Sequence, residues 1–117
     1  MKFAIMVYEP AEEFAARSDP GRAGPYWNSY TAYSQELVAA GVAAGGTALQ
    51  PPQLGTTLRL TGDKRQVQDG PYADTKEQLG GLFVIDVPGV DEALNWASRC
   101  PAARTGAIEV RPVLEMP

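Results

Sequence analysis

Two segments of this chain are apolar on both sides when they are read as strands. One is residues 82–87, and the other is residues 2–8, where two apolar sets alternate: Phe3, Ile5 and Val7 against Ala4, Met6 and Tyr8. A strand with two apolar faces is buried on both, so it lies in the middle of a sheet and not at its edge. The two segments therefore predict a sheet whose centre is covered on both sides.

Only two segments have the spacing of a substantial helix. In the first, Pro25 stands where a first helical residue is expected and Gly41 where a C-terminal cap is expected. The apolar stripe between them consists of Tyr26, Tyr30, Tyr33 and Leu37. We interpret it mainly as core, but buried tyrosine hydroxyls need partners, so some of them could line a cavity. The second helix opens at residues 89–92 and ends at Pro101.

A second strand and a hairpin are predicted between the two helices. Residues 42–50 have the character of a strand, which Gly45-Gly46 interrupts with a bulge or a close backbone approach. Residues 56–61 and 64–68 alternate on both sides of Gly62-Asp63. This pattern indicates a β-hairpin with one solvent-exposed face.

The order of the elements predicts a fold. Residues 107–114 alternate between apolar and polar and suit an edge strand, whereas residues 9–24 suit a connecting loop with at most a helical turn at 11–17. The chain then runs strand, helix, strand, hairpin, strand, helix, strand. This order, with the two most apolar strands in the middle, predicts an α+β fold, a ferredoxin-like βαββαβ sheet with an inserted β-hairpin.

The size predicts one domain and the sheet predicts a partner. A chain of 117 residues is one domain, so we expect a single unit over residues 1–117. Two helices cover only one face of such a sheet, and the other face is apolar too. A second copy of the chain is the simplest cover, so we expect a homodimer.

Composition excludes several classes of function. The net charge of −4 opposes a phosphate backbone, so we expect no direct nucleic acid binding. No apolar run approaches the length that a bilayer requires, and we expect a cytoplasmic protein without a membrane partner. The chain has no histidine, the commonest general base and metal ligand, and its one cysteine, Cys100, precedes Pro101. We therefore expect no metal and no cofactor.

The segment 69–81 is the richest in chemical groups. We propose from sequence that its acids and phenol are catalytic and that further residues bind a ligand: Asp69, Tyr72 and Asp74 as catalytic residues, and Tyr8, Tyr30, Lys76, Glu77 and Arg111 as ligand-binding residues. Loops that join rigid elements commonly carry function. The structural alternative is about as strong, since Asp74 and Glu77 have capping-box spacing and Gly80-Gly81 could end that helical turn.

These residues resemble the DGPF-domain branch of the YCII-related family. The resemblance rests on Asp69-Gly70-Pro71-Tyr72, on residues 74–81 and 83–87, and on Glu109-Val110-Arg111-Pro112. It implies a bacterial dimeric α+β barrel of unassigned activity. The His-Asp pair proposed for catalysis in other members is not present, because this chain has no histidine. Genes of this branch often neighbour alternative sigma factors, which implies a possible transcription-factor partner.

Two functions remain open from the sequence. The first is a small lyase or isomerase that transfers protons with carboxylate and tyrosine groups in a small-molecule pocket around Asp69-Gly70-Pro71-Tyr72. The second is a ligand-sensing or regulatory protein associated with an alternative sigma factor, without catalysis. A purely structural role is a third possibility. Acids that converge on a cavity favour the enzyme, and acids that face solvent favour the alternatives.

Overall fold

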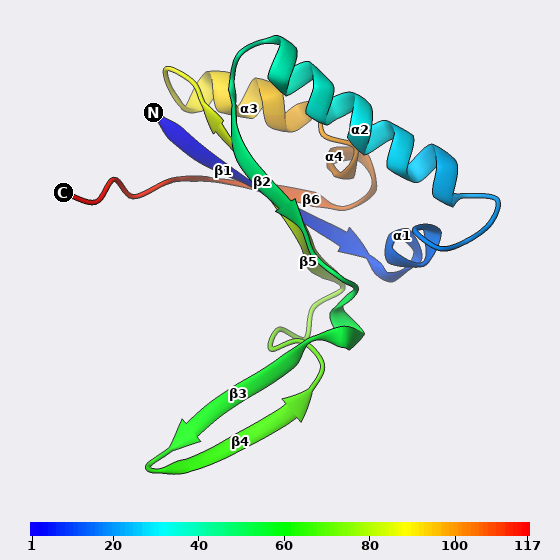
Figure 1. Ribbon diagram of the computed structural model, residues 1–117, viewed down its shortest axis with the longest axis vertical. Coiled ribbons are helices and arrows are strands. Elements are labelled where there is room, and N and C mark those ends of the chain that lie inside the picture. Colours follow the sequence, from blue (N-terminus) through cyan, green and yellow to red (C-terminus); the bar gives the residue numbers. More distant parts are fainter.

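The computed structural model describes residues 1–117 and has a layer of helices on one face of a four-stranded sheet (Figure 1). The elements in chain order are β1 (Lys2–Pro10), α1 (Ala11–Ala16), α2 (Ala23–Ala39), β2 (Ala43–Ala48), the 3-10 turn η1 (Pro52–Leu54), β3 (Thr56–Thr61), β4 (Lys64–Asp69), β5 (Glu77–Asp86), α3 (Val90–Ser98), α4 (Ala102–Thr105) and β6 (Ala107–Pro112).

The central sheet has the strand order β2-β5-β1-β6, and every neighbouring pair is antiparallel. The two segments that are apolar on both sides, in β1 and β5, are the central strands, as predicted. The ferredoxin-like α+β fold is therefore confirmed. The predicted hairpin is also present, and β3 and β4 form a separate two-stranded sheet.

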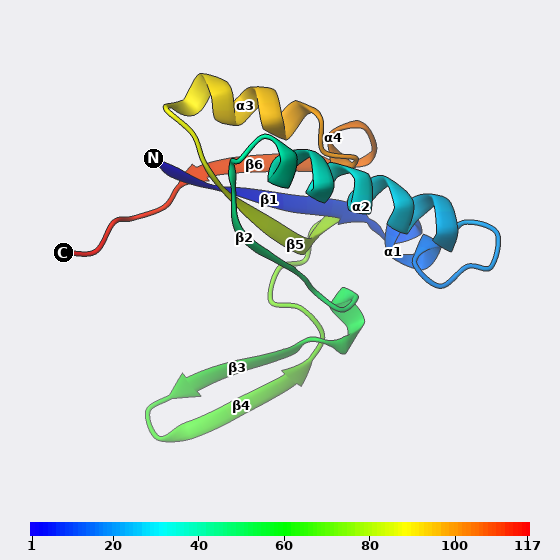
Figure 2. The same ribbon diagram turned by 45° about the horizontal axis from the view of Figure 1, so that its top comes forward.

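The core lies between the sheet and the helices α2 and α3. Phe3, Ile5 and Val7 of β1 are buried under these helices, and Tyr33 of α2 packs edge-on against Phe83 with ring centroids 5.1 Å apart. The opposite face of β1, with Ala4, Met6 and Tyr8, is only half-buried. Figure 2 shows that both longer helices lie on the same side of the sheet and leave this face open. No helix is both long and apolar enough to span a bilayer.

The predicted first helix and the predicted bulge are both present, with small differences in their boundaries. Helix α2 begins at Ala23, two residues before Pro25, and Gly41 follows its end with a φ of 72°. The expected bulge lies between Ala43 and Gly45, where the register of β2 with β5 shifts. The connection after β1 begins two residues later than the expected start at residue 9, because Glu9 and Pro10 still belong to β1.

The predicted capping box at Asp74 is wrong. Asp74 to Lys76 form no helix, and β5 begins at Glu77 and runs through Gly80-Gly81. A helix cap is worth about 1 kcal/mol, whereas strand β5 pairs along its length with β1 and also with β2. The longer ladder of strand hydrogen bonds outweighs the local helix signal.

Candidate functional site

A buried carboxylate marks the end of strand β1. Glu9 follows Phe3, Ile5 and Val7 on the side of β1 that faces the helices, and Glu9 is 1% exposed. It is the one charged or polar residue in the buried set. A charge in such a position is costly unless it is paired and hydrogen-bonded, so its surroundings need a complete account.

Three donors converge on the two oxygens of Glu9. The Tyr26 hydroxyl donates to Oε1 at 2.7 Å, and the Tyr30 hydroxyl donates to Oε2 at 3.2 Å. The Arg17 guanidinium forms an ion pair with Oε1, with Nη2 at 3.4 Å. Helix α2 brings the two tyrosines to the same carboxylate because they are four residues apart on one helix face.

Arg17 is held in place from several sides. Its Nε donates to the Tyr26 hydroxyl at 3.0 Å, and its Nη groups donate to the backbone oxygens of Gly80 and Leu49. The guanidinium carbon also lies 4.8 Å from the centre of the Phe14 ring and 5.4 Å from that of Trp27. The chain's own cation therefore occupies the aromatic surroundings of Glu9.

Both tyrosines remain neutral donors. Burial, followed by the hydrogen bond to Glu9, raises the pKa of Tyr26 far above its ordinary value. Burial, followed by the negative charge of Glu9, does the same to the pKa of Tyr30. The cluster is consequently a carboxylate that accepts hydrogen bonds from two protonated phenols.

Gly80 makes room for this cluster. A Cβ at that position would lie 2.9 Å from Glu9 Oε1 and 3.1 Å from both Arg17 Nη2 and a Phe14 ring carbon. Opposite this point the register of β1 with β5 shifts, since Val7 pairs with Gly81 and Tyr8 with Leu79. The strand irregularity and the missing side chain together leave space for the ion pair.

A cleft of about 620 Å³ opens between helix α2 and the β2–β5 edge of the sheet, and Glu9 and Tyr30 line it. Its cause is the size of the side chains on β2 that share the helix-facing side with Phe83 and Gly81: Ala43, Gly46 and Ala48. Because these side chains are small, space remains between α2 and β2. Trp27 and Val38 are among the apolar residues on the α2 side of the cleft.

A second, smaller cavity of about 310 Å³ reaches the same cluster and is also lined by Glu9, Tyr26 and Tyr30. Here the further charged residues are Glu13 and Arg22, whose side chains form an ion pair at 3.8 Å. Glu9 and its two tyrosines thus separate an apolar cleft from a more polar cavity.

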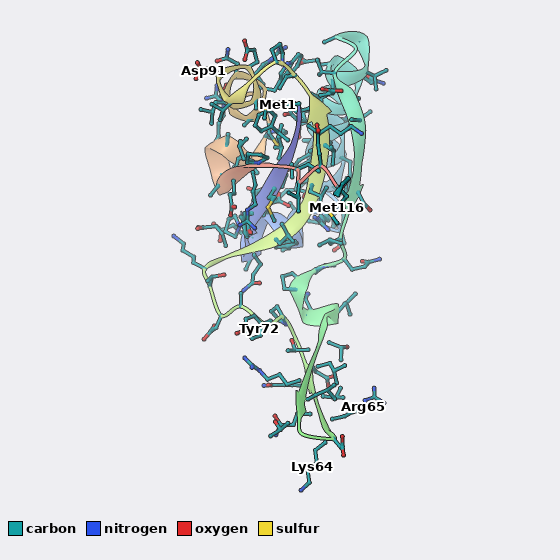
Figure 3. The ribbon with its side chains drawn as sticks, turned by 90° about the vertical axis from the view of Figure 1, so that its left-hand side faces the viewer. Met1, Lys64, Arg65, Tyr72, Asp91 and Met116 are labelled. Atoms are coloured by element: carbon teal, nitrogen blue, oxygen red, sulfur yellow. The ribbon has the colours of Figure 1, made fainter.

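The structure places the three expected catalytic residues on the exposed connection between the hairpin and β5. Asp69 ends β4, and Asp69, Tyr72 and Asp74 are all exposed. Tyr72 is labelled in Figure 3 at the base of the hairpin, where its hydroxyl accepts a hydrogen bond from Arg59 Nη2 at 3.0 Å. Tyr72 and Asp74 share a surface hollow with Arg59. Neither of the two acids, Asp69 and Asp74, is buried.

The expected ligand-binding residues lie in several places. Tyr30 contacts Glu9, whereas Tyr8 lies on the open side of the sheet and lines a hollow together with Tyr72. Lys76 is exposed before β5, and Glu77 is half-buried at its start. Arg111 is exposed on β6 and pairs with Glu109. The eight residues predicted from sequence therefore do not form one cavity, and their roles remain predictions.

Sequence reasoning missed Glu9 and Arg17. The alternation of β1 could have indicated Glu9, because residue 9 continues the buried series of Phe3, Ile5 and Val7. A carboxylate at the next position of such a series needs a buried partner. Arg17 had no comparable signal, since only the fold brings the end of α1 to Gly80.

The fold and this cluster define a class: a ferredoxin-like α+β domain with a carboxylate-centred cleft beneath its first long helix. The chain belongs to the YCII-related domain family, whose model matches residues 1–117. It is similar to an uncharacterised protein of Rhizobium meliloti (strain 1021), with 40% identity over 85 residues, which is 71% of this chain and 68% of that protein. The family expected from the sequence is confirmed, and the DGPF branch stays a prediction.

Proposed function

We propose that this protein binds a small, neutral, mostly apolar molecule in the cleft beneath α2. The observation that carries the proposal is a buried carboxylate, Glu9, at the inner end of an apolar cleft of about 620 Å³. Ligand pockets commonly have this combination of apolar walls, suitable volume and few fixed polar groups.

The free hydrogen-bonding capacity of the cluster indicates the ligand's polar group. Glu9 Oε2 accepts only the hydrogen bond from Tyr30, and a carboxylate oxygen has room for a second. Arg17 already neutralises Glu9 and occupies the surrounding rings. A ligand with a hydroxyl or N–H donor and no net charge therefore suits the site better than an ammonium ion or a carboxylate.

Catalysis at this cleft is the second candidate. A carboxylate flanked by two protonated phenols can accept and return a proton, which a lyase or isomerase requires. The paired cation on Glu9 and the exposed positions of Asp69 and Asp74 favour binding over turnover. The regulatory alternative, a ligand sensor that acts with an alternative sigma factor, uses the same cleft; it is supported by the DGPF-like residues 69–72.

A thermal-shift screen with matched compounds tests the proposal. Neutral ring-containing alcohols, phenols and amides should raise the melting temperature, whereas the corresponding carboxylic acids and amines should not. Ala48→Leu, which adds bulk to the β2 wall of the cleft, should abolish the shift. Ligands that stabilise Ala48→Leu as well as the parent chain would show that they bind elsewhere.

Whether the protein converts a ligand found in this way distinguishes catalysis from binding alone. NMR of the ligand during incubation with the protein should show binding without change for a sensor. If the ligand is converted, loss of conversion in Glu9→Gln but not in Asp69→Asn supports chemistry at the cleft. The reverse pattern would assign the chemistry to the loop at residues 69–74.

A further inference from the structure

The cleft beneath α2 is an elongated groove between a helix and a sheet edge. Its lining includes Trp27 and Val38 on α2, and Ala43 and Ala48 on β2. The helix rises about 16 Å between its two residues at ~1.5 Å per residue. The strand also extends about 16 Å between its two residues at ~3.3 Å per residue. The two walls therefore give the same length for the space that a ligand can fill.

One end of the groove is polar and is closed by Arg17. The guanidinium pairs with Glu9 and also donates to the backbone oxygens of Gly80 in β5 and Leu49 directly after β2. Glu9 and Arg17 are the only charged residues that line the groove, and their charges compensate each other. The groove therefore has one fixed polar end and no net charge to attract an ion.

The other end of the groove is apolar and lies where α2 leads into β2. Leu37, Val38 and Ala43 line it. The connection at residues 40–42 closes this end, and the Val42 amide donates to the Leu37 oxygen at 3.1 Å. From here α2 and β2 diverge toward the Glu9 end (Figures 1 and 2). Val38 is 68% exposed, so an apolar ligand that reaches this end would cover it.

The shape of the groove favours a chain over a compact ring. A ring fills the wide end at Glu9, whereas a straight chain also reaches the narrow end between Val38 and Ala43. Each methylene group that is buried in this way strengthens binding about fourfold. Thr31 and Gln35 stand between the two ends on α2 and are exposed, so they can keep their water when a chain lies against the sheet.

We propose that the ligand of this groove is a neutral straight-chain molecule, a fatty alcohol or a primary fatty amide. Its head donates a hydrogen bond to Glu9, and its chain runs along β2 toward residues 40–42. The inference rests on the proposed function, to which it adds the shape of the ligand and its direction in the groove. The compensated charge of Glu9 and Arg17 selects the neutral head, and the length and the narrow apolar end select the chain.

A series of straight-chain alcohols tests the inference by isothermal titration calorimetry of the full-length chain. From butanol to decanol we expect the affinity to rise about fourfold with each methylene group until the tail reaches residues 40–42. Adamantanol has the same number of carbon atoms as decanol but a compact cage. We expect decanol to bind at least tenfold more tightly than adamantanol.

Ala43→Leu and Ala44→Leu are a matched pair of variants in β2. Ala43 lines the narrow end of the groove, whereas its neighbour Ala44 does not line it, and both residues are exposed. Ala43→Leu should bind butanol like the parent chain and decanol at least tenfold more weakly. Ala44→Leu should reproduce the whole series of the parent. Both variants should keep the circular dichroism of the parent, because neither change lies in the core.

The outcomes separate this inference from the proposed function. Adamantanol that binds as tightly as decanol, or equal decanol affinity in the two variants, would overturn the chain and leave a neutral ligand at the Glu9 end. Decanoate has the chain of decanol with a charged head, and we expect it to bind at least tenfold more weakly than decanol. Equal binding of decanoate would contradict the neutral head of the proposed function, and a protein that binds none of these alcohols would overturn both.

Discussion

At the residue scale, the two tyrosines that donate to Glu9 are expected to contribute unequally to stability. Tyr26 both donates to Glu9 and accepts from Arg17, whereas Tyr30 makes one longer hydrogen bond. We therefore expect Tyr26→Phe to lower the free energy of unfolding by about 1–3 kcal/mol, and Tyr30→Phe by about 0.5–1.5 kcal/mol. Urea denaturation of the two variants measures this order. Equal losses would mean that the Arg17 contact to Tyr26 adds nothing.

The second prediction at the residue scale concerns Gly80. Gly80→Ala places a methyl group 2.9 Å from Glu9 Oε1 and 3.1 Å from Arg17 Nη2, so the ion pair has to move. We expect a loss of about 1–3 kcal/mol, the usual cost of overpacking a filled site. Gly24→Ala in helix α2 is the matched control, because its Cβ meets nothing within 4 Å and alanine favours a helix. The control should match or exceed the stability of the parent in the same denaturation experiment.

At the element scale, the segment before β5 is held by the side chains of Gln78 and Thr75. Gln78 Nε2 donates to the backbone oxygens of Ala73 and Thr75 at 2.7 and 3.1 Å, and the Thr75 hydroxyl donates to the Glu77 oxygen. Gln78→Leu removes two hydrogen bonds worth about 0.5–1.5 kcal/mol each. We expect faster hydrogen exchange over residues 73–77 with little change in α2. Uniformly faster exchange across the whole domain would instead mean global destabilisation.

The same segment shows what the sequence could predict at this scale. The hydrophobic pattern predicted a strand within each of the six strand segments, because burial on one or both faces constrains which positions are apolar. Strand β5, however, begins at Glu77 and not at residue 82. The spacing of Asp74 and Glu77 predicted a helix cap, and the structure has strand there. A local signal of this kind is weaker than pairing with β1 and β2, and the pairing partners are distant in the chain.

The candidate cleft was predictable only in part. The tyrosine stripe of α2 was visible at helical spacing, and the need of its hydroxyls for partners was expected; Tyr26 and Tyr30 donate to Glu9 and Tyr33 donates to the Trp96 oxygen at 2.8 Å. The identity of the acceptors was not visible, because it depends on how α2 crosses the sheet. The cleft itself depends on the small side chains of β2, which read in sequence only as a weak strand.

At the scale of the whole molecule, the buried ionisable groups set how the fold responds to alkali. Burial is the main cause that raises the pKa of Tyr26, Tyr30 and Tyr33 above the ordinary tyrosine value, and it raises the pKa of the Cys100 thiol to about 11. Each group holds its proton more tightly in the folded chain than in the unfolded chain. Its contribution to stability is complete below the unfolded pKa and is lost as the pH rises toward the folded pKa.

The free energy of unfolding should therefore be constant near neutral pH, begin to fall near pH 9 as the unfolded thiol ionises, and fall more steeply above about pH 10 as the unfolded phenols ionise. Urea denaturation between neutral pH and about pH 11 measures this slope. Tyr33→Phe removes one buried phenol and should lessen the fall above pH 10, although it lowers stability at every pH by removing the hydrogen bond to Trp96. Tyr72→Phe, at a residue that is 74% exposed, is the matched control and should keep the slope of the parent. A stability that rose above pH 10, or a slope that Tyr33→Phe left unchanged, would contradict the buried state of these phenols.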